Sequence, residues 1–241
     1  MSHRNDYETI TAIVREQCQR AGFDVVHALQ ADWYNNVVDD PHRLPVFERA
    51  NTLAIIIGNT RALWPRFLDW LRSHPKWLND ANPLDRYVMA NVTAALQPLT
   101  VKYIIRWAHL PDPHHIAFQR LAHIAGLAYL SPSYLSVHPN FGPWIALRAV
   151  VVVDCDGPAA RPVDMANPCG TCENQCMPLF NHALKAVGAF LPGHEAVGEH
   201  WQTWLSIRDA CPVGKEHRYS EEQIRYHYIK DISLLRELVD A

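Results

Sequence analysis

Short apolar runs alternate with longer segments of helical spacing over the first two thirds of the chain. The runs predict β-strands because each is bounded by polar, glycine or proline residues and is too short for a buried helix. The last run is rich in β-branched residues and is expected to be deeply buried. The predicted strands cover residues 23–28, 53–57, 101–107 and 145–153.

Apolar residues that recur every three or four positions predict helices between these strands. The first helix follows a capping residue at Asn5 or Asp6 and ends at Gly22. Thr60 is the expected cap of the second helix. The other two predicted helices cover residues 83–96 and 115–129.

The pattern changes after Asp154. Glycine, proline and cysteine dominate as far as Pro178, and mostly helical segments follow to the end. Strands separated by helices, followed by a helical part, indicate an α+β fold. Because the chain has no internal repeat, low-complexity tract or interdomain linker, we predict one domain over residues 1–241, with a cysteine-rich segment, residues 169–211, inside it.

The composition is that of an ordinary globular protein. The 241 residues are 49% hydrophobic and 20% charged, and the net charge is −3. No basic stripe indicates binding to nucleic acid or to a membrane surface. No apolar run approaches the roughly 20 residues of a membrane span, and the N-terminus lacks the apolar core of a signal peptide. A cytoplasmic location, as a monomer or a homodimer, is therefore expected.

Common nucleotide-binding and hydrolase motifs are absent from the sequence. It contains no G-x-G-x-x-G, G-x-x-x-x-G-K, G-x-S-x-G or H-E-x-x-H segment. Candidate chemistry lies in two other places, the middle of the chain and the cysteine-rich segment. In the middle, His123 is either a core histidine or one that contacts a ligand. The segment from Phe141 to Trp144 predicts a rigid turn flanked by two aromatic rings.

Arg148 lies within the last apolar run. A charge in such a strand is costly without a partner, so the guanidinium requires an anion. A buried Asp or Glu is one candidate, and the carboxylate or phosphate of a bound ligand is the other.

These central segments resemble the cobalamin-processing chaperones of the MMACHC (cblC) family. The likeness covers residues 31–35, 53–57, 122–129, 138–148, 201–209 and 218–223. It implies a flavin-nitroreductase-like α+β fold with a mixed sheet flanked by helices and a mostly helical C-terminal part. It also implies that cobalamin binds base-off and loses its upper axial ligand. In the family that it resembles, cyanide leaves by reduction with reduced flavin and an alkyl group leaves by transfer to glutathione, and the same reactions are expected here.

The resemblance also assigns site residues. Arg148 and Arg208 match arginines that hold the carboxylates of glutathione, a role suited to the guanidinium fork. His123 matches a histidine beside the corrin, which favours the ligand-contacting interpretation. With these three as catalytic residues, the expected corrinoid contacts are Ile116, Ala117, Phe118, Gln119, His123, Leu130, Ser131, Pro132, Ser136, Phe141, Trp144 and Leu147.

Four of the six cysteines are candidate metal ligands. Cys169, Cys172 and Cys176 form a C-x2-C-x3-C pattern, and Cys211 follows 35 residues later, just before a proline. Thiolates bind soft and borderline metals, and four of them suit tetrahedral zinc or an iron–sulfur cluster. The pattern resembles the ferredoxin-type segments of corrinoid-dependent epoxyqueuosine reductases and reductive dehalogenases.

Three interpretations of this cysteine set remain open. A [4Fe–4S] cluster is preferred to structural zinc because it would supply electrons to cobalt. A metal-free thiol–disulfide relay is the third. Cys18 and Cys155 have no partners at ligand spacing and are expected to be buried as small hydrophobic residues.

The resemblance therefore implies an oxidoreductase of the cyanocobalamin reductase and alkylcobalamin dealkylase type. Cobalamin is the expected substrate, with FMN or glutathione as reductant or thiol donor. The expected partners are an electron donor and a protein that accepts the processed cobalamin. Two alternatives are a non-catalytic cobalamin carrier with a structural zinc, and a corrinoid-dependent reductase that acts on an organic substrate.

Overall fold

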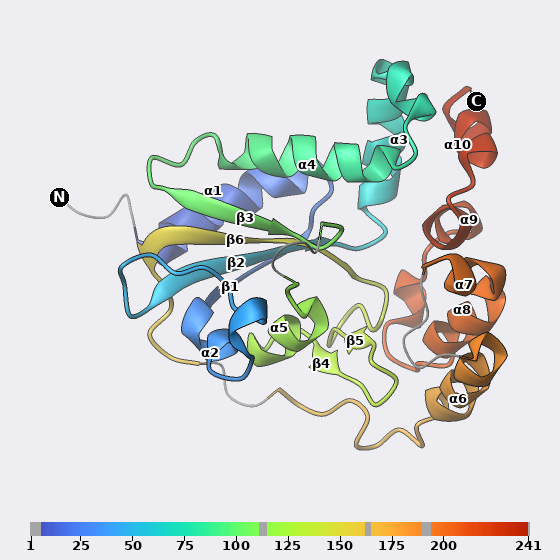
Figure 1. Cartoon of the computed structure of the whole chain (residues 1–241). Helices are drawn as coiled ribbons and strands as arrows, with labels where there is room; N and C mark the ends of the chain where they lie inside the picture. Colours follow the sequence, from blue (N-terminus) through green and yellow to red (C-terminus); the bar gives the residue numbers. More distant parts are fainter. Residues whose placement is uncertain (1–5, 111–114, 162–164, 189–193, 241) are drawn as a thin grey trace.

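The computed structural model describes residues 6–110, 115–161, 165–188 and 194–240 and confirms the α+β class (Figure 1). The strands are β1 (Val25–Gln30), β2 (Thr52–Asn59), β3 (Tyr103–Trp107), β4 (Tyr129–Leu130), β5 (Ser136–Val137) and β6 (Ala146–Asp156). The α-helices are α1 (Tyr7–Arg20), α2 (Ala31–Asn35), α3 (Leu63–Ser73), α4 (Pro83–Leu96), α5 (Phe118–Ile124), α6 (Cys176–Val187), α7 (His194–Glu199), α8 (Trp201–Asp209), α9 (Glu221–Ile229) and α10 (Ile232–Asp240). Short 3₁₀ turns are η1 (Asp40–His42), η2 (Pro75–Asn79) and η3 (Lys215–His217).

A four-stranded sheet in the order β1-β2-β6-β3 lies at the centre of the molecule. Its described pairings are all antiparallel, which corrects the mixed sheet expected from the resemblance. The reason is the path of the chain after β2. Helices α3 and α4 lead the chain to β3, which forms the edge of the sheet opposite β1. Strand β6 then lies between β2 and β3 and runs antiparallel to both.

Helices cover both faces of this sheet, which explains why β2 and β6 are unbroken apolar runs in the sequence. Ile55 and Val151 pack with residues of α1, α3 and α4. The alternate residues Ile56 and Val152 pack with residues of α2 and α5. In Figure 1, α1 and α4 lie above the sheet, and α2 and α5 lie below it.

Two of the predicted helices are confirmed, and one predicted cap is wrong. Asp6 caps α1 through a 2.8 Å hydrogen bond to the helix backbone, and α4 spans the predicted residues 83–96. The N-cap of α3 is Ala62 rather than Thr60. Asp24 accepts hydrogen bonds from the amide (2.7 Å) and the hydroxyl of Thr60, which keeps Thr60 in the preceding loop.

The predicted helix over residues 115–129 is shorter than expected. The helix α5 ends at Ile124, because Gly126 has a φ of +74° and turns the chain out of the helix. The chain then forms the β4–β5 hairpin, which the sequence pattern did not reveal. The helix α2 was also missed, and β1 begins two residues later than predicted.

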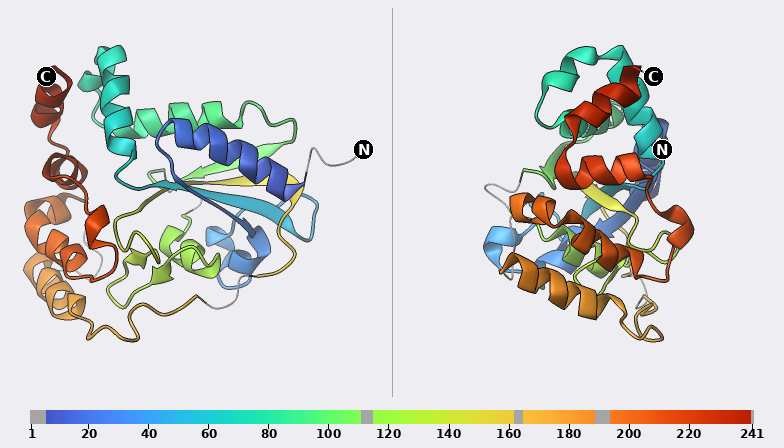
Figure 2. Two further views of the ribbon diagram at one scale, coloured as in Figure 1. Left: turned by 180° about the vertical axis from the view of Figure 1, so that it is seen from behind. Right: turned by 90° about the vertical axis from the view of Figure 1, so that its right-hand side faces the viewer.

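The C-terminal helices α6 to α10 lie together beside one end of the sheet (Figures 1 and 2), which confirms the helical C-terminal part. They have small apolar clusters of their own, one around Trp144 and Leu205 and another around Phe180 and Ile207. The helices α6 and α8 pack against each other. Among the described helices, none has the length and apolar character needed to span a bilayer.

Two glycines join this C-terminal region to the turn before β6. Gly142 has a φ of +55° and Gly214 a φ of +66°. A Cβ atom on Gly142 would lie 1.9 Å from the carbonyl oxygen of Val213, and one on Gly214 would lie 2.3 Å from the carbonyl carbon of Phe141. The two backbone segments are therefore in direct contact, which only glycine permits at these positions.

Candidate functional site

A cavity of about 520 Å³ lies between the start of α5, the β4–β5 hairpin, β6 and the C-terminal helices. Its size lies within the range of small-molecule sites, about 300–1,000 Å³. The residues that line it are Ala108, His115, Ile116, Phe118, Gln119, Tyr134, Leu135, Ser136, Pro143, Ile145, Ala146, Leu147, Arg208 and Tyr228.

Six predicted site residues come together in this lining. They belong to three segments that are far apart in the sequence: the start of α5, the β5–β6 region and α8. Their placement agrees with a common site, while the role of each stays a prediction. These six residues are Ile116, Phe118, Gln119, Ser136, Leu147 and Arg208.

Several predicted contacts lie outside the lining of this cavity. The Nδ1 atom of His123 accepts a hydrogen bond from the amide of Leu130 at 3.3 Å, and its ring meets the ring of Tyr129 edge-on. This histidine therefore ties α5 to the β4–β5 hairpin. The other residues outside the lining are Ala117, Leu130, Ser131, Pro132, Phe141, Trp144 and Arg148.

Trp144 lies beneath Arg208. The Trp144 side chain is 1% exposed, and the Cζ atom of Arg208 lies 4.5 Å from its ring centroid and 5.1 Å from that of Tyr219. The Nη2 atom of Arg208 donates a hydrogen bond to the carbonyl oxygen of Pro143 at 2.5 Å. These contacts hold the guanidinium in the cavity wall.

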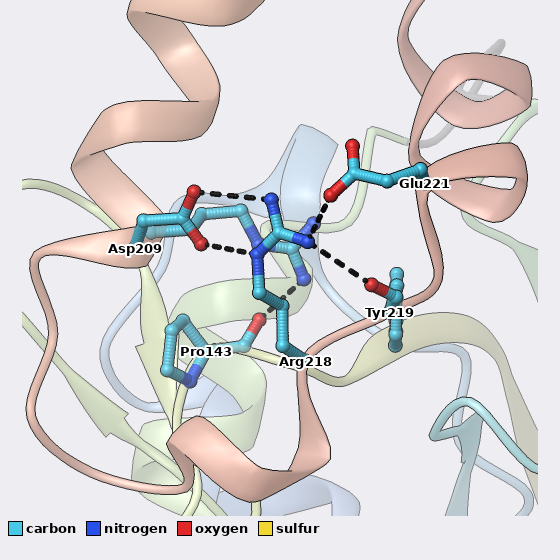
Figure 3. Close-up of polar contacts among 6 residues, drawn as sticks. Pro143, Asp209, Arg218, Tyr219 and Glu221 are labelled. Carbon is cyan, nitrogen blue, oxygen red and sulfur yellow. Dashed lines mark hydrogen bonds and ion pairs between the residues drawn. The ribbon is translucent and has the colours of Figure 1, made fainter.

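Arg218 braces the same region from the C-terminal side. Its Nε atom donates to the carboxylate of Asp209 at 2.7 Å, and its Nη1 atom donates to Glu221 at 2.5 Å (Figure 3). The hydrogen bond to Asp209 is the largest cause that raises the pKa of Arg218. The ion pairs link the end of α8 to the start of α9 and thereby fix the helix that carries Arg208.

Arg148 is an incompletely paired cation. Its Nε atom donates to the side-chain oxygen of Asn59 at 2.7 Å. Its Nη2 atom is buried and has no hydrogen-bond partner among the described residues. Burial lowers the pKa of Arg148, and the positive charge of Arg208 lowers it further. A buried donor without an acceptor is destabilising, so an anion within reach of Nη2 would stabilise Arg148, which itself lies outside the lining of the cavity.

The surroundings of Arg148 are electropositive. Burial lowers the pKa of His227 well below its ordinary value, and the charges of Arg148 and Lys230 act in the same direction. Burial also lowers the pKa of Lys230, which Asp85 opposes. An anion bound here would stabilise the positive charges that the fold has placed together.

Sequence reasoning missed several residues that line the cavity. Tyr228 lies on α9, just beyond residues 218–223, which resemble the family. That closeness could have identified Tyr228 as a candidate site residue. Tyr134 lies in the β4–β5 hairpin, has a φ of +60° and is 58% exposed. Nothing in the local pattern marks Tyr134, because the hairpin itself was not predicted.

A second, much smaller cavity of about 20 Å³ has all four candidate metal-ligating cysteines in its lining. Cys169 and Cys172 lie in the loop before α6, Cys176 is the first residue of α6, and Cys211 follows α8. The packing of α6 against α8 brings Cys211 back to the other three. In the described parts of the chain, no three His, Cys, Asp or Glu side chains are arranged to hold one metal ion.

The remaining two cysteines are buried in the core, as predicted. Cys18 is 0% exposed and Cys155 is 6% exposed. Burial raises the pKa of Cys18 to about 12, so its thiol stays protonated. Burial also raises the pKa of Cys155.

The arrangement of sheet and helices is shared with solved structures. The C. elegans B12-trafficking protein CblC, described as a homologue of human MMACHC, matches 97% of this chain and 96% of its own with a TM-score of 0.74 at 18% identity. Epoxyqueuosine reductase from Bacillus subtilis matches 88% of this chain and 67% of its own with a TM-score of 0.50 at 12% identity. The fold is therefore of the CblC type, with a more distant likeness to epoxyqueuosine reductase.

Sequence comparison assigns the chain to one family within this fold class. Residues 22–235 match the model of the methylmalonic aciduria and homocystinuria type C (MMACHC) family. The human cyanocobalamin reductase / alkylcobalamin dealkylase is 30% identical over an alignment of 229 positions, which covers 85% of this chain and 72% of the relative. Its counterpart from Danio rerio is 27% identical over an alignment of 241 positions, which covers 91% of this chain and 88% of the relative. The chain belongs to the MMACHC family.

Proposed function

We propose that this protein binds cobalamin as its substrate and removes the upper axial ligand of the cobalt, as the names of its relatives indicate. The observation that carries the proposal is the 520 Å³ cavity. Apolar side chains such as Ile116 and Leu147 meet the cationic Arg208 there, on segments far apart in the sequence. A large ring with polar side arms and a reactive centre requires such a combination of apolar walls and polar groups.

Reductive decyanation is the first proposed reaction. Cobalt(III) accepts one electron and becomes cobalt(II), and the bond to cyanide breaks with both of its electrons on carbon, so that cyanide leaves as an anion. Base-off binding assists this step because the loss of the lower nitrogen ligand makes the cobalt easier to reduce. Reduced FMN, or an iron–sulfur cluster held by the four cysteines with zinc as the structural alternative, would supply the electron.

Thiol-dependent dealkylation is the second proposed reaction. The thiolate of glutathione attacks the alkyl carbon, a carbon–sulfur bond forms, and the cobalt keeps the electron pair of the broken bond. Arg148 and Arg208 hold the carboxylates of the thiol, a role supported by the unpaired Nη2 of Arg148 and by the lining position of Arg208. His123 acts through the hairpin that it holds, because its Nδ1 already accepts the amide of Leu130.

We further propose that residues 1–241 form a single cobalamin-binding domain that includes the cysteine-rich segment. Leu135 of the hairpin packs in the same apolar cluster as Cys176 and Trp204, which supports this unity. The protein acts in the cytoplasm, receives electrons from a donor protein and passes processed cobalamin to an acceptor.

The test is the absorption spectrum of cyanocobalamin at saturating protein. Binding is expected to shift the spectrum to the base-off form, and a reductant is then expected to release cyanide. Leu147→Trp fills the cavity wall and should weaken binding about tenfold or more, whereas Lys102→Trp, exposed at another surface, should leave it unchanged. An unchanged cobalamin spectrum with the wild-type protein would remove the proposal.

Two further outcomes separate the alternative functions. Base-off binding without release of cyanide, at every reductant supplied, would indicate a carrier. Cobalamin that stays bound through many turnovers of an organic substrate would indicate a resident cofactor. Stoichiometric release of processed cobalamin supports the proposed reaction.

A further inference from the structure

The small cysteine cavity is assembled by tertiary structure. Cys169, Cys172 and Cys176 lie within eight residues of one another, whereas Cys211 comes from beyond two further helices. The packing of α6 against α8 closes this interval and places the fourth thiol in the same cavity lining. In Figure 1 the loop that precedes α6 runs beneath the hairpin before it reaches these helices. The cavity therefore holds four thiols only because the tertiary structure brings Cys211 to the other three cysteines.

The four cysteines of the cavity differ from ordinary buried core residues. Cys18 and Cys155 show what that role looks like in this protein, because both are buried among apolar side chains. The four clustered cysteines are only half-buried. All four line the same small cavity, which brings their side chains into one place.

The remaining lining of the cavity suits a thiolate-bound metal. Leu135, Val137 and Ile207 form apolar walls, which keep water from the sulfur atoms. Ser131 and Ser133 add buried hydroxyl groups, whose oxygens lie 3.1 Å apart. Hydroxyl groups beside sulfur ligands donate hydrogen bonds that tune a metal–thiolate centre. Cys176 is also the first residue of α6, and the first turn of a helix stabilises negative charge.

We propose that Cys169, Cys172, Cys176 and Cys211 are the four thiolate ligands of one metal centre. Thiolate ligation selects soft or borderline metals, either one zinc ion or iron with inorganic sulfide. The open space of about 20 Å³ is little more than the volume of one water-sized probe. In the described residues no three of these thiols are arranged to hold one ion. Binding therefore requires the sulfur atoms to move into a ligand set, and Cys169 and Cys172 lie in an irregular loop that can adjust.

The position of this centre gives it access to the larger cavity. Leu135 lines both cavities. It is held in a tight turn, in which the Leu135 amide donates to the Ser131 hydroxyl at 3.1 Å and the Ser131 amide donates to the Leu135 carbonyl at 2.9 Å. A metal at the four thiols thus lies one side chain away from the site proposed for cobalamin. This last point rests on the proposed function, whereas the metal centre itself does not.

The experiment measures iron, acid-labile sulfide and zinc per chain in full-length protein prepared without oxygen. The wild-type protein is expected to contain either about one zinc, or about four iron with about four sulfide, per chain. Cys169→Ser, Cys172→Ser, Cys176→Ser and Cys211→Ser should each lose most of that metal. Cys18→Ala and Cys155→Ala are the matched controls, because they remove buried thiols outside the cavity, and should keep it.

A second measurement does not depend on how the variants fold. Thiol alkylation of the wild-type protein, followed by peptide mass spectrometry, is compared before and after removal of metal with a chelator. The four cysteines should become reactive only after chelation. Wild-type protein that holds no iron or zinc after reconstitution, a disulfide between any two of the four, or full metal in any of the four serine variants would overturn the proposal.

The same preparations separate this inference from the proposed function. Metal-free wild-type protein that still shifts cyanocobalamin to the base-off form, and never takes up metal, refutes the centre and leaves cobalamin binding intact. Metal-loaded protein that leaves the cobalamin spectrum unchanged refutes cobalamin binding and leaves the centre intact.

Discussion

The sheet region and the C-terminal region of this molecule are stabilised by different means. Around the sheet, two extensive apolar clusters cover both faces, and Ile55 and Ile56 are fully buried. The helices α6 and α8 pack in small clusters, around Trp144 and Phe180, and the cysteines beside them are half-buried. The helices α9 and α10 instead place Tyr226 and Leu235 in the larger cluster of the sheet. A small apolar core stabilises a segment weakly. The C-terminal region therefore depends on its joins to the sheet region and on the metal proposed for its thiols.

Truncation of one buried isoleucine in each region tests this difference most directly. Ile55→Ala should lower the free energy of unfolding by about 3–5 kcal/mol, because a sheet packed on both faces closes poorly around the cavity that remains. Ile207→Ala should cost about 2–3 kcal/mol, because its small cluster relaxes more easily. Urea unfolding measures both losses, and equal values would contradict the comparison.

Substitution at the glycine contact between the regions should lower stability nearly as much as Ile55→Ala does. Gly142→Ala is expected to lower the free energy of unfolding by about 2–4 kcal/mol, because the new methyl group meets the backbone of Val213 in a left-handed conformation. Gly188→Ala is the matched control. Gly188 has a φ of +66° with nothing within 4 Å of a Cβ atom, so only the cost of the left-handed backbone applies, about 1–2 kcal/mol. Chemical unfolding of both variants gives the difference, and equal losses would argue against a tight contact at Gly142.

Catalysis should require both regions at once, because Arg148 comes from the sheet and Arg208 from α8. Arg148→Ala and Arg208→Ala should each weaken glutathione binding by about 1.5–3 kcal/mol, roughly tenfold to a hundredfold, through loss of a charge-assisted hydrogen bond. The measurement is the glutathione dependence of alkylcobalamin dealkylation, with corrinoid binding followed separately.

Arg225→Ala removes an exposed arginine that pairs with Asp231 on the surface and serves as the control. If Arg148→Ala and Arg208→Ala both kept full glutathione-dependent rates, the thiol donor would be a molecule other than glutathione.

The smallest expected effect is a pH dependence at the boundary between the regions. The ring of His227 lies beside those of Trp64, Tyr219 and Tyr226, and burial, with Arg148, Lys230 and Arg208, lowers its pKa well below the ordinary value. In the unfolded chain the pKa returns to about 6.5. The unfolded state therefore binds a proton more readily, and stability that is complete above this pH falls as the pH decreases.

The melting temperature of His227→Phe should consequently fall less between neutral pH and pH 5 than that of the wild type. His182→Phe, exposed on α6, is the control and should keep the wild-type slope. A wild-type slope in His227→Phe as well would show that other groups cause the acid sensitivity.

Regular elements with strong local patterns were predictable from the sequence. Asp6 and the spacing after it defined α1, and the unbroken apolar run defined β6. The hairpin was not predictable, because its strands have two residues each and are fixed by contacts with α5. The Thr60 cap failed because Asp24, 36 residues away, competes for its hydroxyl and its amide.

The candidate site was predictable to a similar extent. Arg148 stood out as a charge in an apolar strand, whereas its partner Asn59 depends on how β2 pairs with β6. Spacing along the chain grouped three cysteines, but the place of Cys211 depends on the packing of α6 against α8. Trp144 was predicted to contact the corrinoid, but it lies outside the cavity lining, because tertiary packing places it beneath Arg208.

The contact between Gly142 and Gly214 also has a consequence for the order of folding. It joins positions 72 residues apart in the sequence, and the turn that carries Gly142 leads into β6, whose pairing with β2 fixes the position of that turn. The sheet, with its strands already paired, offers a preformed turn on which the later helices dock. Substitutions at this contact should therefore accelerate unfolding and leave the folding rate almost unchanged.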